Sequence, residues 1–391
     1  MTCPDCGIEG ILDVRYDYDA MAGALSREDL ERSRENSLWR YLPLLPVSDA
    51  TKLPPLRTGW TPLVSAPGVL GLDRLYIKDE SPNPTASLKD RATAVAMARA
   101  LDENVGAVAA ASTGNAGCSL AGFAAATGLP CFIFVPRSAP RPKVAQLLVY
   151  GATVFAVDGS YDDAFELATE AIQRFGWYNR CCAVNPFLVE GKKTVAFEIC
   201  EALRFGVPDK VFVPVGDGCI MSGTYKGFYE FMRLGLTRRV PKLIGVQAEG
   251  CQPVKRAFDG RCDVEPCEAC TLADSIAVGH PRNWRKAVKA VRASEGEMIT
   301  VTDDEITAAI GDLARATGIY GEPAGVTAFA GLRKAVERGE VGRRETVVVL
   351  MTGSGLKDTE SALRAAGAPI EIGRSIEDVE HALSGSGQGR T

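Results

Sequence analysis

The sequence predicts an α/β protein built on parallel sheets. From residue 74 to residue 358, apolar runs of strand length alternate with longer segments in which apolar residues recur every three or four positions. Strands that alternate with helices in this way form parallel sheets covered by helices on both faces. A chain of 391 residues, 46% of them hydrophobic, has room for roughly two to three domains.

Seven apolar runs are expected to be buried strands, and nearly every one ends in a Gly, Ser, Thr or Asp turn. They cover residues 74–80, 106–113, 131–136, 153–159, 210–216, 242–250 and 346–353. Amphipathic helices are expected between them, as over residues 160–176 and 190–206. In open α/β sheets ligands bind at the carboxyl ends of strands, so the turns after these strands are where a functional site is expected.

The first seventy residues follow another pattern. We expect a short strand over residues 12–19, a helix over residues 27–42, and an extended connector rich in Pro and Thr over residues 45–63. Residues 1–52 are therefore interpreted as an N-terminal extension packed on the main body.

The charge pattern argues against several classes of partner. The net charge is −5, and no run of five or six like charges occurs, so neither a nucleic-acid nor a membrane surface is expected as a partner. No apolar stretch reaches membrane-spanning length, and the N-terminus lacks the pattern of a signal peptide. We therefore expect a cytoplasmic protein whose twelve cysteines are reduced thiols.

Two C-x-x-C pairs leave one alternative open. Cys3 with Cys6, and Cys267 with Cys270, have zinc-ligand spacing, and they would form a tetrahedral site if the fold brought them together. Ordinary thiols are the simpler interpretation, and no metal is expected. With only His280 and His381 in the chain, zinc hydrolase and Ser-His-Asp chemistry are disfavoured.

Lys89 occupies an unusual position. Apolar residues recur at helical spacing from Leu88, which places Lys89 in the first turn of a helix. The helix dipole is positive at that end and disfavours an ammonium group. Three strand-end turns could share a site with Lys89: residues 111–117, 215–223 and 350–358. The second is rich in glycine and opens a helix, which is the physical make-up of a phosphate cradle.

Six motifs in order carry a family resemblance. They are residues 83–92, 112–117, 190–199, 213–220, 321–325 and 352–358. Together they resemble the pyridoxal-phosphate enzymes of the tryptophan-synthase-β fold type, and in particular the threonine synthase-like family, over residues 53–358.

The resemblance implies a domain organisation. It implies two parallel-sheet α/β domains with the pyridoxal phosphate cofactor in the cleft between them. The larger, cofactor-binding domain would span residues 53–92 and 187–358, and the smaller domain residues 93–186. Residues 359–391 are expected to form a C-terminal helix and a flexible tail, and the family favours a homodimer.

The resemblance also implies residue roles. Lys89 matches the lysine that carries the cofactor as a Schiff base, and a helix start in a partly buried site favours the neutral amine that this chemistry needs. Asn115 matches the amide that binds the phenolic oxygen of the ring, and Thr352 the hydroxyl at the pyridine nitrogen. The remaining matches are the phosphate cradle, Gly216, Asp217, Gly218, Cys219 and Ile220, and the substrate-binding residues Ser112, Thr113 and Lys143.

The chain departs from the family where the family holds the phosphate of O-phosphohomoserine. A hydroxyl, an arginine and an Asn-Ser pair are replaced by Ala116, Leu188 and the pair Cys182-Ala183, and the first cradle residue, usually Asn, is Asp217. Lys192, where the family often has glutamine, is a candidate to take over the arginine's role. We therefore expect poor turnover of O-phosphohomoserine.

These observations predict a lyase resembling threonine synthase that eliminates or replaces a β or γ substituent of a small α-amino acid through an external aldimine. The alternatives are a genuine threonine synthase, a serine or threonine-type dehydratase, and a β-replacement synthase. A paralogue that binds the cofactor without catalysis, or a zinc-ribbon interaction module, is disfavoured because Lys89, Asn115 and Thr352 are all present.

Overall fold

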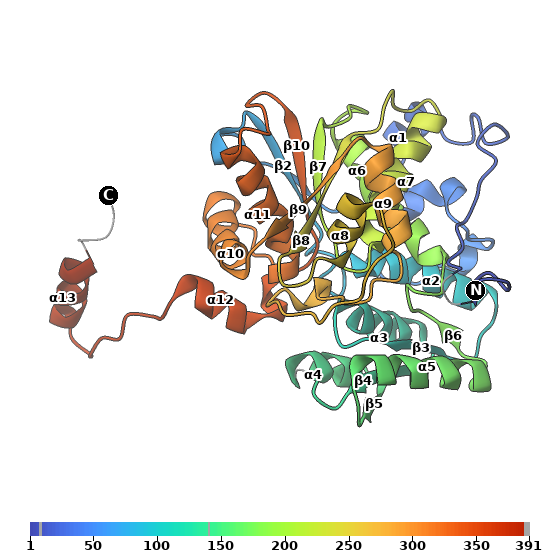
Figure 1. Ribbon diagram of the computed structural model, residues 1–391, viewed down its shortest axis with the longest axis horizontal. Helices are drawn as coiled ribbons and strands as arrows, with labels where there is room; N and C mark the ends of the chain where they lie inside the picture. Colours follow the sequence, from blue (N-terminus) through green and yellow to red (C-terminus); the bar gives the residue numbers. More distant parts are fainter. Residues whose placement is uncertain (8–9, 140, 387–391) are drawn as a thin grey trace.

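The structure is a computed structural model, and it describes residues 1–7, 10–139 and 141–386. It contains two sheets of mainly parallel strands with helices packed around them (Figure 1), which confirms the predicted fold class. The larger sheet has six strands in the order β1-β2-β10-β7-β8-β9, and only β1 runs antiparallel to its neighbour. Their bounds are Leu63–Ser65, Arg74–Asp79, Thr346–Met351, Lys210–Pro214, Lys242–Ala248 and Glu297–Val301.

The smaller sheet has four parallel strands in the order β5-β4-β3-β6. Their bounds are Thr153–Val157, Cys131–Pro136, Val108–Ala111 and Tyr178–Asn179. The chain thus enters the larger sheet at β1 and β2, builds the smaller sheet, and returns to the larger one. The predicted domain limits at residues 93 and 186 agree with this excursion, although they stay a prediction as domain boundaries.

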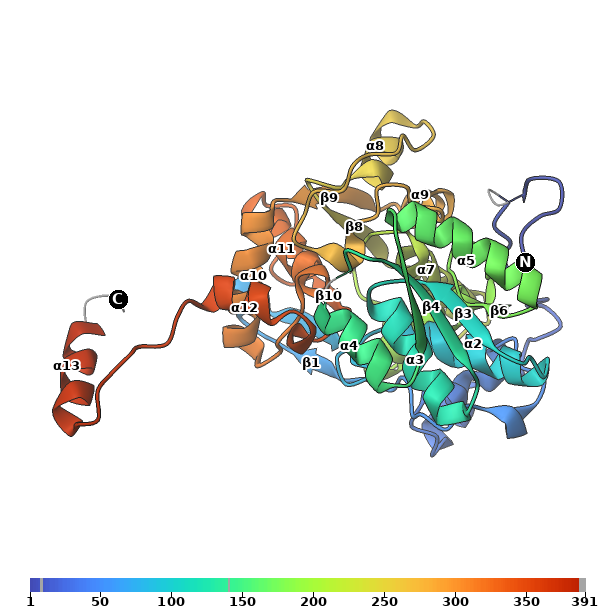
Figure 2. The same ribbon diagram turned by 90° about the horizontal axis from the view of Figure 1, so that it is seen from below.

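Helices separate the sheets and cover them. Around the smaller sheet lie α3, α4 and α5, which Figure 2 shows from below. Helix α2 packs on α3 and α6, and α6 packs on α7, so these helices join the two halves. The bounds of α2 to α7 are Lys89–Asp102, Asn115–Thr127, Arg141–Val149, Tyr161–Phe175, Phe187–Ala202 and Cys219–Arg233. Those of α8 to α11 are Pro253–Gly260, Trp284–Ala293, Asp303–Thr317 and Pro323–Glu337.

The N-terminal extension differs from the expectation. Residues 12–19 form no strand, because this segment lies against helices and not along a sheet edge: the Tyr16 hydroxyl donates to Glu190 Oε2 on α6 at 2.8 Å. The expected helix over residues 27–42 is also interrupted. Helix α1 (Arg27–Arg32) ends where Ser33 turns extended, and a separate 3₁₀ segment begins at Leu38.

The C-terminal region holds two helices where one was expected. Helix α12 (Thr359–Ala366) lies beside α10, and α13 (Ile376–Ser386) stands away from the body at the end of an extended segment (Figure 1). Residues 384–386, at the start of the expected Gly/Ser tail, belong to α13. The rest of that tail, residues 387–391, lies outside the described part of the chain. No helix in that described part is both long and apolar enough to span a membrane.

A buried ionic cluster ties the start of α2 to the rest of the molecule. Arg91, fully buried, donates to Glu80 at the end of β2 (2.6 and 2.8 Å) and to Glu198 on α6 (2.5 and 2.7 Å). Lys78 adds a bond of 2.7 Å to Glu198 Oε2. Since a guanidinium that binds two carboxylates bidentately has a fixed orientation, this cluster sets the position of α2 and of Lys89, two residues away.

Candidate active site

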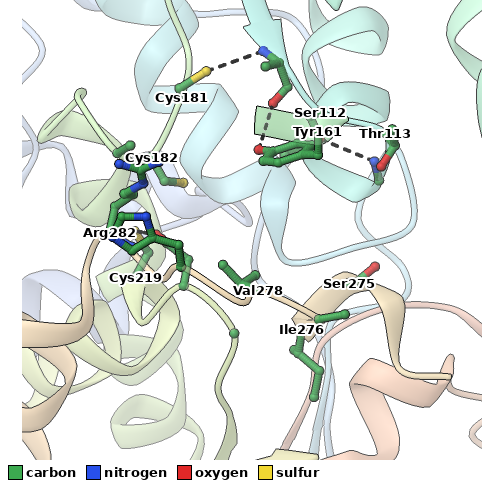
Figure 3. A pocket seen from close by; sticks show the side chains of 18 of the residues that line it. Ser112, Thr113, Tyr161, Cys181, Cys182, Cys219, Ser275, Ile276, Val278 and Arg282 are labelled. Atoms are coloured by element: carbon green, nitrogen blue, oxygen red, sulfur yellow. Dashed lines mark hydrogen bonds between the residues drawn. The ribbon is translucent and has the colours of Figure 1, made fainter. Parts of the chain in front are cut away.

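A cavity of about 660 Å³ opens at the carboxyl ends of the strands, between the two sheets. This volume lies in the range that holds a cofactor-sized ligand. Most of the site residues predicted from the sequence line it: Lys89, Ser112, Thr113, Asn115, Gly216, Asp217, Gly218, Cys219 and Ile220. Figure 3 shows part of this wall, with side chains from segments distant in the sequence meeting around one space. Thr352 and Lys143 are not among the lining residues.

Lys89 is the first residue of α2, as the sequence predicts. Its Nζ forms neither a hydrogen bond nor an ion pair with any described residue. Burial lowers the pKa of Lys89, and the nearby Lys192 ammonium lowers it further. The position of Lys89 at the start of α2 thus disfavours the ammonium form and favours a neutral amine that faces the cavity.

The turn before α7 has the backbone geometry that an anion cradle needs. Gly218, the residue before the helix, has φ +102°, a conformation that favours glycine. An added Cβ there would lie 2.8 Å from the carbonyl oxygen of Asn283. The first N–H groups of α7, from Cys219 onward, have no carbonyl partner within the helix and suit a phosphate group.

Asp217 does not act in this cradle as a free negative charge. Its carboxylate accepts hydrogen bonds from the Arg282 backbone N–H (2.7 Å) and from Asn283 Nδ2 (2.6 Å). These bonds fasten the segment before α9 to the cradle. The expected repulsion of a bound anion by Asp217 is thus reduced by two donors that share its charge.

Asn115, at the start of α3, meets two residues to which the sequence analysis gave no role. Its Nδ2 donates to Glu322 Oε1 at 2.6 Å, and its Oδ1 accepts from Lys357 Nζ at 2.8 Å. Burial raises the pKa of Glu322, against the effect of Lys357. Both residues belong to motifs that were recognised, 321–325 and 352–358, so only their contacts were missed.

The turn before α3 has its own internal bonding. Ser112 Oγ accepts from the N–H groups of Gly114 (3.3 Å) and Gly117 (3.0 Å), so this hydroxyl shapes the turn. The N–H groups at the start of α3 and the Thr113 side chain remain the groups in this turn that suit a substrate carboxylate.

Thr352 and Lys143 have different surroundings. The Thr352 carbonyl oxygen accepts from the Leu88 N–H at 2.9 Å, which places the end of β10 beside the start of α2. The Thr352 hydroxyl has no hydrogen-bond partner within the described residues and is available to a ring nitrogen. Lys143 forms an ion pair with Asp274, so its ammonium already has a carboxylate.

The residues that depart from the family pattern separate into two groups. Leu188 has no exposed surface and packs in the hydrophobic core, away from the cavity. Ala116, Cys182, Ala183 and Lys192 all line the cavity. Cys182 lies beyond β6, which ends at Asn179, and the Asn179 side chain accepts from the Cys181 N–H at 2.8 Å and turns the chain.

Arg180 and Lys192 give the cavity wall a positive charge. They are 1% and 0% exposed, and no carboxylate pairs with either of them in the described part of the chain. Arg180 donates to Thr93 Oγ1 and to the Lys89 carbonyl oxygen, and Lys192 Nζ lies 3.1 Å from Cys182 Sγ. Lys192 was a candidate from the sequence, whereas Arg180 carried no local signal.

The C-x-x-C pairs do not assemble a metal centre here. Among the residues that the structure describes, no group of three or more His, Cys, Asp or Glu side chains could hold a metal ion. Cys3 and Cys6 are near each other, and the Cys267 thiol interacts with Cys251.

Comparisons with known proteins agree with this geometry. Residues 55–353 match the family model described as pyridoxal-phosphate dependent enzyme. The chain is 42% identical to threonine synthase of Methanocaldococcus jannaschii over 95% of this chain and 92% of that protein. It is 38% identical to threonine synthase of Synechocystis sp. over 85% of this chain and 86% of that protein.

Solved structures share the fold. Threonine deaminase isoform 2 from Solanum lycopersicum superposes with a TM-score of 0.68 at 23% identity, covering 84% of this chain and 92% of that one. Diaminopropionate ammonia lyase from Escherichia coli also gives 0.68, at 19% identity, covering 85% and 93%.

The chain therefore belongs to the pyridoxal-phosphate-dependent enzymes, and its cofactor is pyridoxal phosphate. Within that family its relatives are threonine synthases. The residues present fit the cofactor: a lysine with a lowered pKa that lines the cavity, a helix start for the phosphate, and, at Thr352, a hydroxyl with no hydrogen-bond partner among the described residues.

Proposed function

We propose that this chain eliminates or replaces a substituent at Cβ or Cγ of a small α-amino acid, as a carbon–oxygen lyase related to threonine synthase. The observation that carries the proposal is the unpartnered Lys89 amine, which faces a cavity bordered by the starts of α3 and α7. In such a site the Lys89 amine can transfer a proton, and the free N–H groups at the starts of α3 and α7 can each bind an anion.

Each group has a role in this proposal. The amine of Lys89 would hold the cofactor and, once released by substrate, would move a proton at Cα. The N–H groups from Cys219 onward would hold the cofactor phosphate, Asn115 the phenolic oxygen, and Thr352 the ring nitrogen. When bound, pyridoxal phosphate supplies the electron sink for negative charge at Cα. A hydroxyl partner at the ring nitrogen moderates that sink, which favours elimination or replacement over transamination.

A second candidate is threonine synthase activity on O-phosphohomoserine. It is favoured by Arg180 and Lys192, two buried cations for which the described residues offer no carboxylate partner, and by the names of the relatives. Against it stand Ala116 and Ala183, whose side chains offer no donor to a phosphate. Transfer of a phosphate group from water into a site with too few donors costs roughly several kcal/mol. Whether Arg180 and Lys192 make up for the missing hydroxyls at Ala116 and Ala183 therefore decides whether O-phosphohomoserine is a substrate.

Two experiments test the proposal. Borohydride reduction of the holoenzyme should fix the cofactor on the peptide that contains Lys89, and a Lys89→Ala protein should lose turnover; attachment elsewhere would refute the role of Lys89. Steady-state kinetics should then be measured on amino acids with hydroxyl, acetyl, phosphate and sulfur leaving groups. Efficient conversion of O-phosphohomoserine to threonine would select the second candidate.

A further inference from the structure

Two cysteines from different halves of the molecule meet on the cavity wall. Cys182 follows β6 of the smaller sheet, and Cys219 is the first residue of α7, in the cradle of the larger half. The Cys219 thiol donates to Asp217 Oδ2 at 3.3 Å and lies close enough to the Cys182 sulfur to influence its pKa, and Figure 3 shows both side chains on the same side of the cavity. A disulfide between them would link the two halves.

The surroundings of Cys182 favour a thiolate. Lys192 Nζ lies 3.1 Å and Arg180 Nη1 lies 3.9 Å from its sulfur. A buried cation is costly without a nearby anion, and within the described residues no carboxylate pairs with either cation. The nearby Cys219 thiol, together with Lys192 and Arg180, holds the pKa of Cys182 well below its usual value.

The neighbouring Cys181 provides a contrast within the same peptide. Its sulfur accepts from the Ala111 N–H at 3.4 Å, as Figure 3 shows, and burial raises its pKa to about 11. Burial, with the nearby Cys182 sulfur, raises the pKa of Cys219 as well. All three cysteines line the cavity, but of the three thiols only Cys182 has a lowered pKa and two cations beside its sulfur, which is what a reactive cysteine needs.

We propose that Cys182 and Cys219 form a hydroperoxide-reactive thiol pair that closes into a disulfide across the cavity wall. The Cys182 thiolate attacks one peroxide oxygen, the O–O bond breaks, and the sulfenic acid of Cys182 forms while the alcohol or water leaves. Cys219 then attacks that sulfur, the S–O bond breaks, and water leaves. Overall, two thiols are oxidised to one disulfide and one hydroperoxide is reduced.

Asp217 is placed to assist the second step. The Cys219 thiol lies 3.3 Å from Asp217 Oδ2 and can pass its proton to that carboxylate. The resulting bond would fix the first residue of the phosphate cradle to the segment after β6. We therefore expect the oxidised protein to bind the cofactor and substrate less well and to recover with dithiothreitol.

The test is peptide mapping of the holoenzyme after hydrogen peroxide. Trypsin should yield residues 181–192 linked to residues 211–226, with the bond assigned to Cys182 by fragmentation and removed by dithiothreitol. In unoxidised protein, iodoacetamide at neutral pH should label Cys182 first, with Cys181 as the internal control. Preferential labelling of Cys181, or no cross-link in folded protein exposed to peroxide, would overturn the proposal.

Variants separate reactivity from simple accessibility. Lys192→Gln should raise the pKa of Cys182 and slow its alkylation at a pH between the two pKa values, whereas Lys210→Gln, at the opposite end of β7 from the cradle and paired with Glu345, should not slow it. Cys219→Ser should leave the sulfenic acid of Cys182 unresolved and open to a dimedone probe. An equal alkylation rate in Lys192→Gln, or no dimedone adduct in oxidised Cys219→Ser, would refute the assignment.

Discussion

Replacement of Arg91 by methionine should destabilise the protein strongly while it preserves most of the packing. Arg91 has no exposed surface, and its guanidinium binds both Glu80 and Glu198, which are also buried. In the variant, Lys78 would still pair with Glu198, whereas Glu80 would lose its guanidinium partner. Methionine has a similar length, so the change mainly removes charge.

The expected loss follows from the charge that remains. Burial alone would raise the pKa of Glu198, but Arg91 and Lys78 together lower it from 4.5 to about 2. That lowering corresponds to about 3 kcal/mol of preference for the ionised form. Loss of one partner of a buried ion pair typically costs about 3–5 kcal/mol. We therefore expect the free energy of unfolding, measured by urea denaturation of the holoenzyme at pH 7, to fall by about this amount.

The pH dependence gives the prediction its sign. In the wild type the folded pKa of Glu198 lies below its ordinary value, so its contribution is present above about pH 4.5 and is lost as the pH falls toward 2. In Arg91→Met the buried carboxylates should have raised pKa values, so they should take up protons as the pH falls from 7 to 5. The difference in free energy of unfolding between the wild type and the variant should therefore become smaller over this range. Arg343→Met, at an exposed ion pair with Asp73, should cost less than about 1 kcal/mol. If Arg91→Met lowered the free energy of unfolding by less than about 1 kcal/mol, or by an amount independent of pH, the buried ion pairs would not have the role given to them here.

Two glycine substitutions test the frame of the site. Gly218→Ala should weaken cofactor affinity roughly tenfold or more in an absorbance titration, since the added Cβ would meet the Asn283 carbonyl at 2.8 Å. Gly235→Ala, the control, carries a similar backbone strain of about 1–2 kcal/mol without that contact, so it should leave cofactor affinity unchanged. If the two variants bound the cofactor equally well, the turn at Gly218 would not be part of the cofactor site. Gly191→Ala should destabilise the protein by about 1–3 kcal/mol in thermal unfolding, because its Cβ would lie 1.9 Å from a backbone oxygen where α2 crosses α6. Gly106→Ala, which meets nothing within 4 Å, is the control, and equal melting temperatures would contradict the close crossing.

The predicted strands show what local patterns can and cannot reveal. All seven apolar runs contain a strand, because buried parallel strands are continuous apolar segments with turn residues at their ends. The strands β1, β6 and β9 were missed: the first two are only three and two residues long, and β9 is a short run directly after a helix. Residues 12–19 were wrongly predicted as a strand. Their sequence suits a strand, but the segment lies against helices and has no sheet edge with which to pair.

The candidate site divides in the same way. Lys89, the turn before α3 and the glycines before α7 were found because each is a local feature of chain direction and residue type. The contacts of Asn115 with Glu322 and Lys357 bring together residues more than two hundred positions apart, and no local pattern encodes them. Arg180 has no local pattern that marks it, and only the fold shows that it is buried.

The sequence by itself determined the class of fold, the positions of most strands along the chain, the lysine that faces the cavity and the family of the chain, because periodicity and short motifs are local properties. Only the tertiary structure decided the local charge and reactivity of the site. Leu188 packs in the core and not at the cavity, Lys192 and Arg180 line the cavity with no carboxylate partner among the described residues, and both lie beside the Cys182 sulfur and lower its pKa. Burial and distance set these properties, and both arise when helices and sheets remote in sequence pack together.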